Sequence, residues 1–177
     1  MRMRPKFCPD CGSALTEIVF DNKTRLYCEK CAKPIYENPL PATCVVAFNK
    51  SGKVLIAKRA VEPSIGEWSL PGGFVEIDET PSEGALRELL EETGLRGNII
   101  SHLGTEGQKS NTYTNVMVAG FLVTTDGIPS ANDDIADAKW FNIDSAPRLV
   151  FSSHRRIFNR AIESLSRTLL PNVSREL

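Results

Sequence analysis

The sequence predicts an α/β protein in which a mixed sheet lies between two helices, preceded by a small cysteine-rich module. Three features support this: two Cys-x-x-Cys pairs near the start, several β-branched apolar runs after residue 40, and two stretches with helical apolar spacing. The 177 residues, 41% hydrophobic and 24% charged, give room for one ordinary domain and a small module. We place the module at 1–36 and the larger domain at 37–177.

The module is defined by four of the five cysteines, which occur as Cys8-Pro-Asp-Cys11 and Cys28-Glu-Lys-Cys31. Two such pairs separated by 16 residues have the spacing of a tetrahedral four-thiolate zinc site. Between them, Asp21-Asn22-Lys23-Thr24 separates two strand-like runs, which predicts a hairpin. The module is therefore expected to be a zinc ribbon that its metal holds folded. Two disulfides are the alternative, which the lack of a signal peptide disfavours.

Charge and hydropathy narrow the expected partners. The net charge of −1 gives no overall positive field for nucleic acid or an anionic membrane, and no apolar run approaches the roughly 18 residues of a membrane span. Through Lys33 the module carries seven Lys/Arg and four Asp/Glu. A four-thiolate zinc centre contributes about −2, so a structural or interface role is favoured over nucleic-acid binding. We expect a cytoplasmic protein.

The larger domain begins after PIYENPLP (34–41), whose three prolines predict an extended linker. ATCVVAFN and KVLIAKR follow, and Asn49-Lys50-Ser51-Gly52 joins them as a predicted β-hairpin. Cys44 in the first run is interpreted as a buried thiol. Further strands are expected at TNVMVAGFLVTT (114–125) and AKWFNI (138–143). SSHRRIFNRAIESLSRTL predicts an amphipathic helix, capped by Ser152 or Ser153.

A second helix is predicted over 80–93. Thr80 is its N-cap, Pro81 takes the first helical position, Glu83 closes a capping box, and Gly94 ends it. Its apolar residues form one face, which places Glu88, Glu91 and Glu92 on the opposite side. Such a cluster is either a solvated acidic face or the hard-oxygen environment that Mg²⁺ or Mn²⁺ requires.

The spacing around this helix decides between the two. Gly73 is followed after five residues by Glu79, and after seven more by Arg87-Glu88-Leu89-Leu90-Glu91-Glu92-Thr93-Gly94-Leu95. These residues match every fixed position of the Nudix box, G-x5-E-x7-R-E-U-x-E-E-x-G-U, where U is aliphatic. The chain therefore resembles a Nudix hydrolase over about residues 40–170. With its ribbon it resembles the group that includes NADH, FAD and ADP-ribose pyrophosphatases.

This resemblance implies roles for individual residues. Glu88, Glu91 and Glu92 match the glutamates that hold Mg²⁺ or Mn²⁺ against a substrate diphosphate, and the Gly72 carbonyl would complete the coordination. Glu79 and Arg87 match a pair that ties the loop to the helix. The general base is either a box glutamate or an acidic residue on a later loop, where NDDIAD supplies Asp133, Asp134 and Asp137. The implied fold is an α/β/α Nudix sandwich.

The substrate is less well defined by the sequence. The S-Q-P-W-P-F-P-x-S motif of ribbon-bearing NADH pyrophosphatases does not follow Leu95, whereas LVFSSHRRIF resembles the L-x-F-[DS]-[HS] stretch of ADP-ribose and FAD pyrophosphatases. Phe151 there either stacks on a base or packs in the core. Lys58 and Arg59 either meet phosphate or form a solvated strand end.

The expected function is therefore metal-dependent cleavage of a small nucleoside diphosphate derivative such as ADP-ribose, FAD or an NADH-like dinucleotide. The alternatives are a nucleotide-sensing binding protein, in which the ribbon binds the partner, and a house-cleaning enzyme that cleaves nucleoside triphosphates. The intact box favours an enzyme over a sensor. The sequence leaves a homodimer open.

Overall fold

The computed structural model describes residues 4–110 and 115–169 and divides the chain into two compact units, with a boundary between Leu40 and Pro41. Each unit is described by itself. No helix in these ranges combines the length and apolar character needed to span a membrane.

The smaller unit is built on a three-stranded antiparallel sheet in the order β1-β2-β3: β1 Thr16–Phe20, β2 Lys23–Cys28 and β3 Lys33–Ile35. The predicted hairpin is confirmed, since Phe20 pairs with Lys23 across a two-residue turn. Asp21 and Asn22 in this turn both have positive φ, 50° and 59°. Asp and Asn tolerate this left-handed conformation, which matches the twist of the flanking strands.

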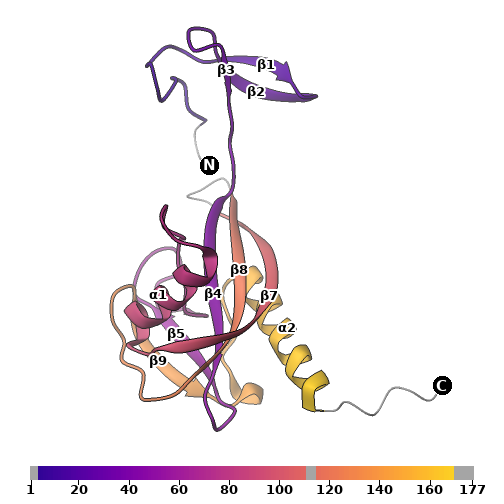
Figure 1. Ribbon diagram of the computed structural model, residues 1–177. Helices are drawn as coiled ribbons and strands as arrows, with labels where there is room; N and C mark the ends of the chain where they lie inside the picture. Colours follow the sequence, from indigo (N-terminus) through magenta and orange to yellow (C-terminus); the bar gives the residue numbers. More distant parts are fainter. Residues whose placement is uncertain (1–3, 111–114, 170–177) are drawn as a thin grey trace, which may run out of the picture. The chain divides into compact units, whose positions relative to one another are not determined.

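The larger unit contains a six-stranded sheet in the order β6-β5-β4-β8-β7, with β9 paired to β5. Figure 1 shows α1 on one side of this sheet and α2 on the other, so the predicted fold class is confirmed. The elements are β4 Leu40–Phe48, β5 Val54–Arg59, β6 Trp68–Ser69, α1 Pro81–Thr93, β7 Gly97–Lys109, β8 Asn115–Thr125, β9 Ile135–Phe141, a short 3₁₀ turn at Ile143–Ser145, and α2 Ser152–Leu169.

The β4–β5 hairpin forms where the sequence predicts it. The Asn49 side chain accepts hydrogen bonds from the backbone N–H groups of Ser51 and Lys53, both at 3.0 Å. Gly52 has φ +72°, a conformation that glycine adopts without a steric cost. The turn therefore combines an Asn side-chain bridge with a glycine in the left-handed region.

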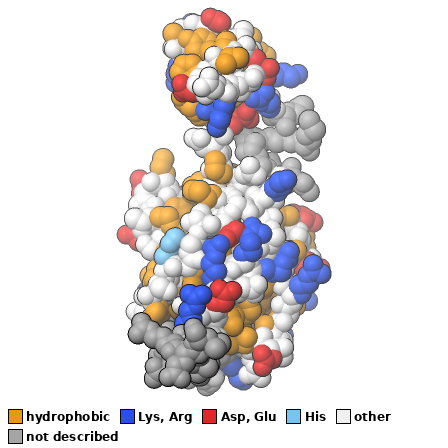
Figure 2. Space-filling view, turned by 90° about the vertical axis from the view of Figure 1, so that its right-hand side faces the viewer, with side chains coloured by type: hydrophobic (Ala, Val, Ile, Leu, Met, Phe, Trp, Pro, Cys, Tyr) orange, Lys and Arg blue, Asp and Glu red, His pale blue; other side chains and the backbone are white. Residues whose placement is uncertain are grey.

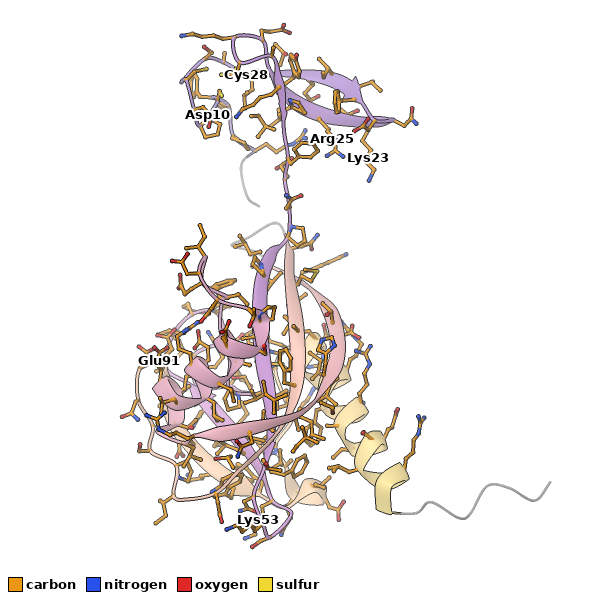
Figure 3. The ribbon with its side chains drawn as sticks, in the orientation of Figure 1. Asp10, Lys23, Arg25, Cys28, Lys53 and Glu91 are labelled. Atoms are coloured by element: carbon orange, nitrogen blue, oxygen red, sulfur yellow. The ribbon has the colours of Figure 1, made fainter. Side chains whose placement is uncertain are left out.

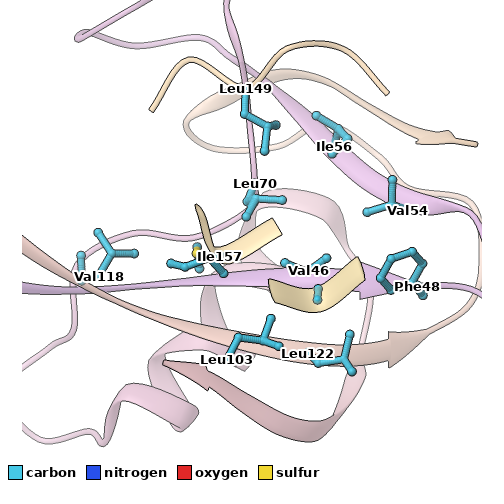
Figure 4. Close-up of a cluster of buried hydrophobic side chains, with 13 residues drawn as sticks. Val46, Phe48, Val54, Ile56, Leu70, Leu103, Val118, Leu122, Leu149 and Ile157 are labelled. Carbon is cyan, nitrogen blue, oxygen red and sulfur yellow. The ribbon is translucent and has the colours of Figure 1, made fainter. Parts of the chain in front are cut away.

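Alternate residues of β4 supply the two halves of the core. Val46 and Phe48 pack in a cluster with Ile157 of α2, which Figure 4 shows in close-up. Val45 and Ala47 belong to a second cluster, which includes the α1 residues Ala85 and Leu89. The apolar run predicted as one strand is thus buried on both faces, as a central strand between two helices should be.

Three details differ from the sequence-based expectation. The predicted extended linker at 34–41 is shorter than expected, because its ends belong to β3 and β4 and only residues 36–39 lie between these strands. The predicted strand at 138–143 starts earlier and ends at Phe141. The sequence indicated no element at 97–109, yet β7 extends over all 13 of these residues. Its glycines and its partly buried alternation, at the edge of the sheet, give a weak apolar signal.

Charged side chains join α2 to β7. Glu106 accepts from both Arg156 and Arg160 of α2, and these arginines also donate to the Gly107 and Leu103 carbonyls. Figure 2 shows this face of the larger unit, where basic side chains gather with acidic ones among them. This network and the apolar core hold α2 against the sheet.

Candidate functional site

Helix α1 starts and stops where the sequence predicts. Thr80 is the N-cap, its side chain accepts from the Glu83 N–H, and the Glu83 carboxylate accepts from the Thr80 N–H at 2.7 Å, which completes the capping box. Gly94 ends the helix with φ 71°, and its N–H donates to the Leu90 carbonyl at 2.8 Å. The two caps fix which residues of the helix face the preceding loop.

All five N–H groups of the Arg87 guanidinium find acceptors. Nε donates to one Glu79 oxygen at 2.9 Å, and the terminal nitrogen Nη2 donates to the other at 2.6 Å. Nη2 also donates to the Phe74 carbonyl at 3.0 Å. The other terminal nitrogen donates to Glu88 at 2.9 Å and to Glu91 at 2.8 Å. Arg87 thus ties the 74–79 loop to α1, and it also restrains two of the three helix glutamates.

Glycines let the loop approach the helix closely. A Cβ at Gly73 would lie 2.4 Å from the Glu88 carboxylate, and a Cβ at Gly84 would lie 2.7 Å from Glu79. A Cβ at Gly72, where φ is +148°, would lie 2.2 Å from the Thr43 carbonyl oxygen. No larger residue fits at these positions without a shift of its neighbours.

The carbonyls on either side of Gly72 accept hydrogen bonds from β4, but the Gly72 carbonyl does not. The Pro71 and Gly73 carbonyls accept from the Val45 and Thr43 N–H groups of β4, at 2.9 and 2.8 Å. No hydrogen-bond donor within residues 4–110 and 115–169 reaches the Gly72 carbonyl. Within these ranges its oxygen is therefore free to bind a cation or to accept a hydrogen bond.

The three glutamates do not share one solvated face, which excludes the first of the two alternatives given for this cluster. Glu92 is only 5% exposed, and its carboxylate accepts from the Gly72 N–H at 3.0 Å. Glu88 is also largely covered, whereas the Glu91 side chain, labelled in Figure 3, is 47% exposed. Because Glu92 lies toward the Gly72 turn, a solvated acidic face does not describe this cluster.

Burial and ion pairing give the carboxylates of this site different pKa values. Loss of hydration raises the pKa of Glu92 to about 8, and burial also raises the pKa of Glu88. Hydrogen bonds from Arg87 lower the pKa of Glu79 to about 2. Glu79 is thus a permanent anion paired with Arg87, while Glu88 and Glu92 are carboxylates whose charge this environment only partly offsets.

The loop between β8 and β9 adds acidic residues to this cluster. The backbone N–H groups of Ser130 and Asn132 donate to the α1 carbonyls of Thr93 and Glu92, both at 3.0 Å. The charge of Asp134 raises the pKa of Glu92 and that of Asp133 raises the pKa of Glu88, each by a minor amount beside burial. Asp137, the third candidate, pairs with Lys139 on β9 instead.

Arg59 and Phe151, two predicted substrate residues, lie together. The Arg59 guanidinium is 5.2 Å from the centre of the Phe151 ring. Its Nε donates to the Pro63 carbonyl at 2.7 Å, and a terminal nitrogen donates to the Val61 carbonyl at 3.3 Å. Arg59 is therefore a restrained cation and not a solvated strand end, and one face of Phe151 is already covered.

His154, which the sequence did not single out, is buried beside this pair. Its ring centre lies 5.1 Å from that of Phe151, and its Nδ1 accepts from the buried Leu70 N–H at 3.1 Å. Burial, with a smaller contribution from Arg59, lowers the pKa of His154 to about 3. A histidine within a helical stretch has no distinctive sequence signal unless its partner, 84 residues away, is known.

The predicted zinc cysteines converge in the smaller unit. One ligand atom from each of Cys8, Cys11, Cys28 and Cys31 lies within 4.8 Å of all the others, and no other such group of three or more ligand residues occurs in the described part of the chain. Figure 3 labels Cys28 in this unit. All four are free thiols, and hydrogen bonds from Ser13 lower the pKa of Cys11 to about 6. Hydrogen bonds to Cys11 and Cys28 raise the pKa of Cys31, as in a set of thiols that share protons.

Comparison with known proteins decides the family. A model of the NUDIX domain matches residues 38–161. The chain belongs to the Nudix hydrolase family. The resemblance drawn from the box is thereby confirmed.

Similar Nudix proteins include an ADP-ribose pyrophosphatase of Methanocaldococcus jannaschii, 36% identical over 120 residues that cover 66% of this chain and 70% of that protein. A NAD-capped RNA hydrolase NudC of Pseudomonas fluorescens is 29% identical over 146 residues, or 81% of this chain and 50% of that protein. The chain thus spans about half the length of the NAD-capped RNA hydrolases that it matches.

Solved Nudix structures show the same fold. A NUDIX hydrolase from Nitrosomonas europaea superposes with a TM-score of 0.74 at 25% identity and covers 92% of both chains. The NUDIX domain of Shewanella oneidensis NrtR, solved with ADP ribose, gives a TM-score of 0.66 at 26% identity and covers 78% of this chain and 94% of that one.

We expect Arg87→Lys to destabilise the Nudix unit by about 1–3 kcal/mol, because an ammonium keeps the charge but cannot serve all these acceptors. The folded pKa of Glu79, about 2, lies below its ordinary value of 4.5. The stabilisation by this ion pair is therefore present above about pH 4.5 and is lost as the pH falls toward 2.

Urea unfolding of metal-free protein at pH 7 and pH 3 measures this difference. Arg96→Lys is the matched control, since Arg96 is exposed and its side chain makes no hydrogen bond or ion pair with the described residues. If the Arg87→Lys protein unfolds at the wild-type urea concentration at pH 7, the guanidinium of Arg87 does not anchor the 74–79 loop.

Proposed function

We propose that this Nudix protein hydrolyses the diphosphate linkage of a nucleoside diphosphate joined to a second group, releasing a nucleoside monophosphate. ADP-ribose is the first substrate to test. Support comes from the similarity to an ADP-ribose pyrophosphatase and to a NUDIX domain solved with ADP ribose. The sensor and triphosphate-cleaving alternatives share the same fold, so activity has to separate them.

One observation carries the proposal, namely the unbalanced negative charge at α1. Glu88 and Glu91 share Arg87 with Glu79. Glu92 has no ion-pair partner in the described residues, and the charge of Arg59 only partly offsets its own. Two of these glutamates are largely buried, where an uncompensated charge is costly. Such a cluster favours the binding of a cation.

The donor atoms fit Mg²⁺ or Mn²⁺. Both ions prefer oxygen ligands, and we propose that Glu88, Glu91, Glu92 and the Gly72 carbonyl supply them. When bound, such an ion would neutralise phosphate oxygens and lower the pKa of a water molecule. Arg87 holds one oxygen of Glu88 and one of Glu91, so the second oxygen of each carboxylate would serve the ion.

The remaining groups support binding and proton transfer. We propose that Arg59, held by two loop carbonyls, contacts a substrate phosphate through its remaining N–H groups. The Phe151 ring packs against the Arg59 guanidinium and would hold it in place. A carboxylate that is not a metal ligand can accept the proton of the attacking water at its oxygen. Asp134 is the later-loop candidate, because it lies close enough to Glu92 to raise its pKa.

The smaller unit has a separate, structural role in this proposal. Four sulfurs around a tetrahedral Zn²⁺ lie about 3.8 Å apart when each Zn–S bond is about 2.3 Å. The four ligand atoms within 4.8 Å of one another are compatible with this geometry. With all four ligands from the chain, zinc here would hold the ribbon folded and would not take part in hydrolysis.

The test is an assay of purified protein with Mg²⁺ or Mn²⁺ against ADP-ribose, FAD, NADH, a NAD-capped RNA and nucleoside triphosphates. We expect cleavage of ADP-ribose to AMP and ribose 5-phosphate with the highest kcat/KM. The NAD-linked compounds are included because several relatives are NAD-capped RNA hydrolases. Tight ADP-ribose binding without turnover at any metal concentration would instead support the sensor, and preferred triphosphate cleavage would support the house-cleaning enzyme.

A further inference from the structure

The Trp68–Gly73 segment connects the sheet with the Nudix loop. Backbone hydrogen bonds hold it on two sides, because Val150 donates to the Trp68 carbonyl at 2.8 Å and Val45 donates to the Pro71 carbonyl at 2.9 Å. The position of Gly72 is therefore determined by contacts made by the residues just before it. A glycine has no side chain with which to anchor itself.

Within this segment the Leu70 N–H depends on a side chain from another element. Leu70 is 1% exposed, and its N–H donates to Nδ1 of His154, a residue of the first turn of α2. Figure 4 shows Leu70 in the core cluster that also contains Leu149 and Ile157. Water does not replace a partner in such a packed apolar region, so the N–H would be unsatisfied without His154.

The imidazole is suited to this task in one tautomer only. An Nδ1 that accepts from a backbone N–H carries no proton, so the proton of the neutral ring is on Nε2. The lowered pKa of His154, caused first by burial, keeps the ring neutral at ordinary pH. The acceptor is thus constantly available.

We infer that His154 is a positioning residue: by accepting from Leu70 it fixes the Gly72 carbonyl, two residues further on, in the place where the metal site uses it. The inference rests on the proposed function. The Val45 and Thr43 N–H groups also restrain the turn through the Pro71 and Gly73 carbonyls, and the Gly72 N–H bonds to Glu92, which is itself a proposed ligand. His154 provides a restraint that does not depend on any residue of the metal site.

Two variants separate this role from simple filling of space. In His154→Asn the amide oxygen can occupy the position of Nδ1 and accept from Leu70, whereas His154→Leu keeps a comparable volume without an acceptor. We expect the Leu variant to bind Mn²⁺ about 10-fold more weakly, by analogy with the loss of supporting groups around metal ligands. The Asn variant should stay within about twofold of wild type. His102→Leu, at the other histidine, is the matched control.

Electron paramagnetic resonance of Mn²⁺ titrated into full-length protein without substrate gives the affinities, and circular dichroism verifies folding. Equal affinity in the wild type and the Leu variant would overturn the inference, and so would an Asn variant as weak as the Leu variant. Glu88→Gln is titrated alongside: if it loses Mn²⁺ while the histidine variants do not, the metal site stands without the positioning role. If Glu88→Gln binds normally, the proposed metal site itself fails.

A measurement on the wild type covers the case in which the Leu variant does not fold. Long-range ¹H–¹⁵N correlation spectra distinguish the two imidazole tautomers. We expect the Nε2–H form for His154, with its Nδ1 shifted as a hydrogen-bond acceptor. An Nδ1–H tautomer would overturn the inference, because that nitrogen could not accept from Leu70.

Discussion

Glu92→Gln should lower kcat on the best substrate by about 100-fold or more and at the same time make the metal-free protein more stable. The loss in rate follows from removing the charge of a proposed metal ligand, while the amide oxygen can still accept from Gly72. The gain in stability follows from burial. The folded pKa of Glu92, about 8, lies above its ordinary value of 4.5. Ionising it in the folded state therefore costs free energy that glutamine does not require.

The sign of the pH dependence is specific. Below about pH 4.5 Glu92 is protonated in both the folded and the unfolded state, so the variant gains nothing. Between pH 4.5 and about 8 the unfolded state releases the proton first, and the advantage of the variant grows, to the order of 4 kcal/mol at pH 8. Metal binding also requires the deprotonated form, so less Mg²⁺ should be needed for half-maximal activity as the pH rises toward 8.

Thermal unfolding with a chelator at pH 5 and pH 8, and kcat at saturating Mg²⁺, measure both effects. Glu91→Gln is the contrast, because the Glu91 side chain is 47% exposed. It should lose activity without gaining stability, since its carboxylate is half-exposed and paired with Arg87. Near-full activity of Glu92→Gln would mean that its carboxylate does not hold the metal.

Cys28→Ser should abolish zinc binding and unfold the smaller unit. Cys28 is fully buried within the four-thiol cluster, and a serine oxygen is a poor replacement for a thiolate. Structural zinc in small modules contributes on the order of 10 kcal/mol at neutral pH, which is more than a three-stranded sheet of this size can supply by itself. Hydrogen exchange in residues 16–35 should become fast, while α1 stays protected.

Zinc content by mass spectrometry and hydrogen exchange on the same samples test this expectation. Cys44→Ala provides the control, since Cys44 is a buried thiol of the larger unit outside the cluster. It should keep about one equivalent of zinc. A wild-type protein that carries far less than one equivalent and contains disulfides between these cysteines would refute the zinc site.

Sequence spacing predicted the elements whose determinants are local. Thr80, Glu83 and Gly94 specify both ends of α1 through their own hydrogen bonds, and the two Cys-x-x-Cys pairs need only a hairpin between them. The sequence did not predict β7, because this strand is held in the sheet by its pairing with β8 and its glycines weaken the local preference for a strand.

The burial of Glu92 is the part of the site that helical spacing did not predict. Helical geometry alone assigns its angle around α1, but burial depends on the Gly72 turn, which approaches from 20 residues away in sequence. The same limitation applies to His154 and Leu70, since a buried N–H that needs an acceptor leaves no mark in the local sequence. Long-range contacts of polar groups were therefore the part that periodicity could not supply.

The attachment of the β8–β9 loop to α1 divides this loop into two parts that should differ in their tolerance of cleavage and insertion. Ile128, at the tip, is 94% exposed, and a protease can reach such a segment easily. The Ser130 and Asn132 N–H groups are bound to α1 carbonyls, so an added residue there would displace Asp133 and Asp134. A tag or reporter peptide is better inserted beside Ile128 than two residues later.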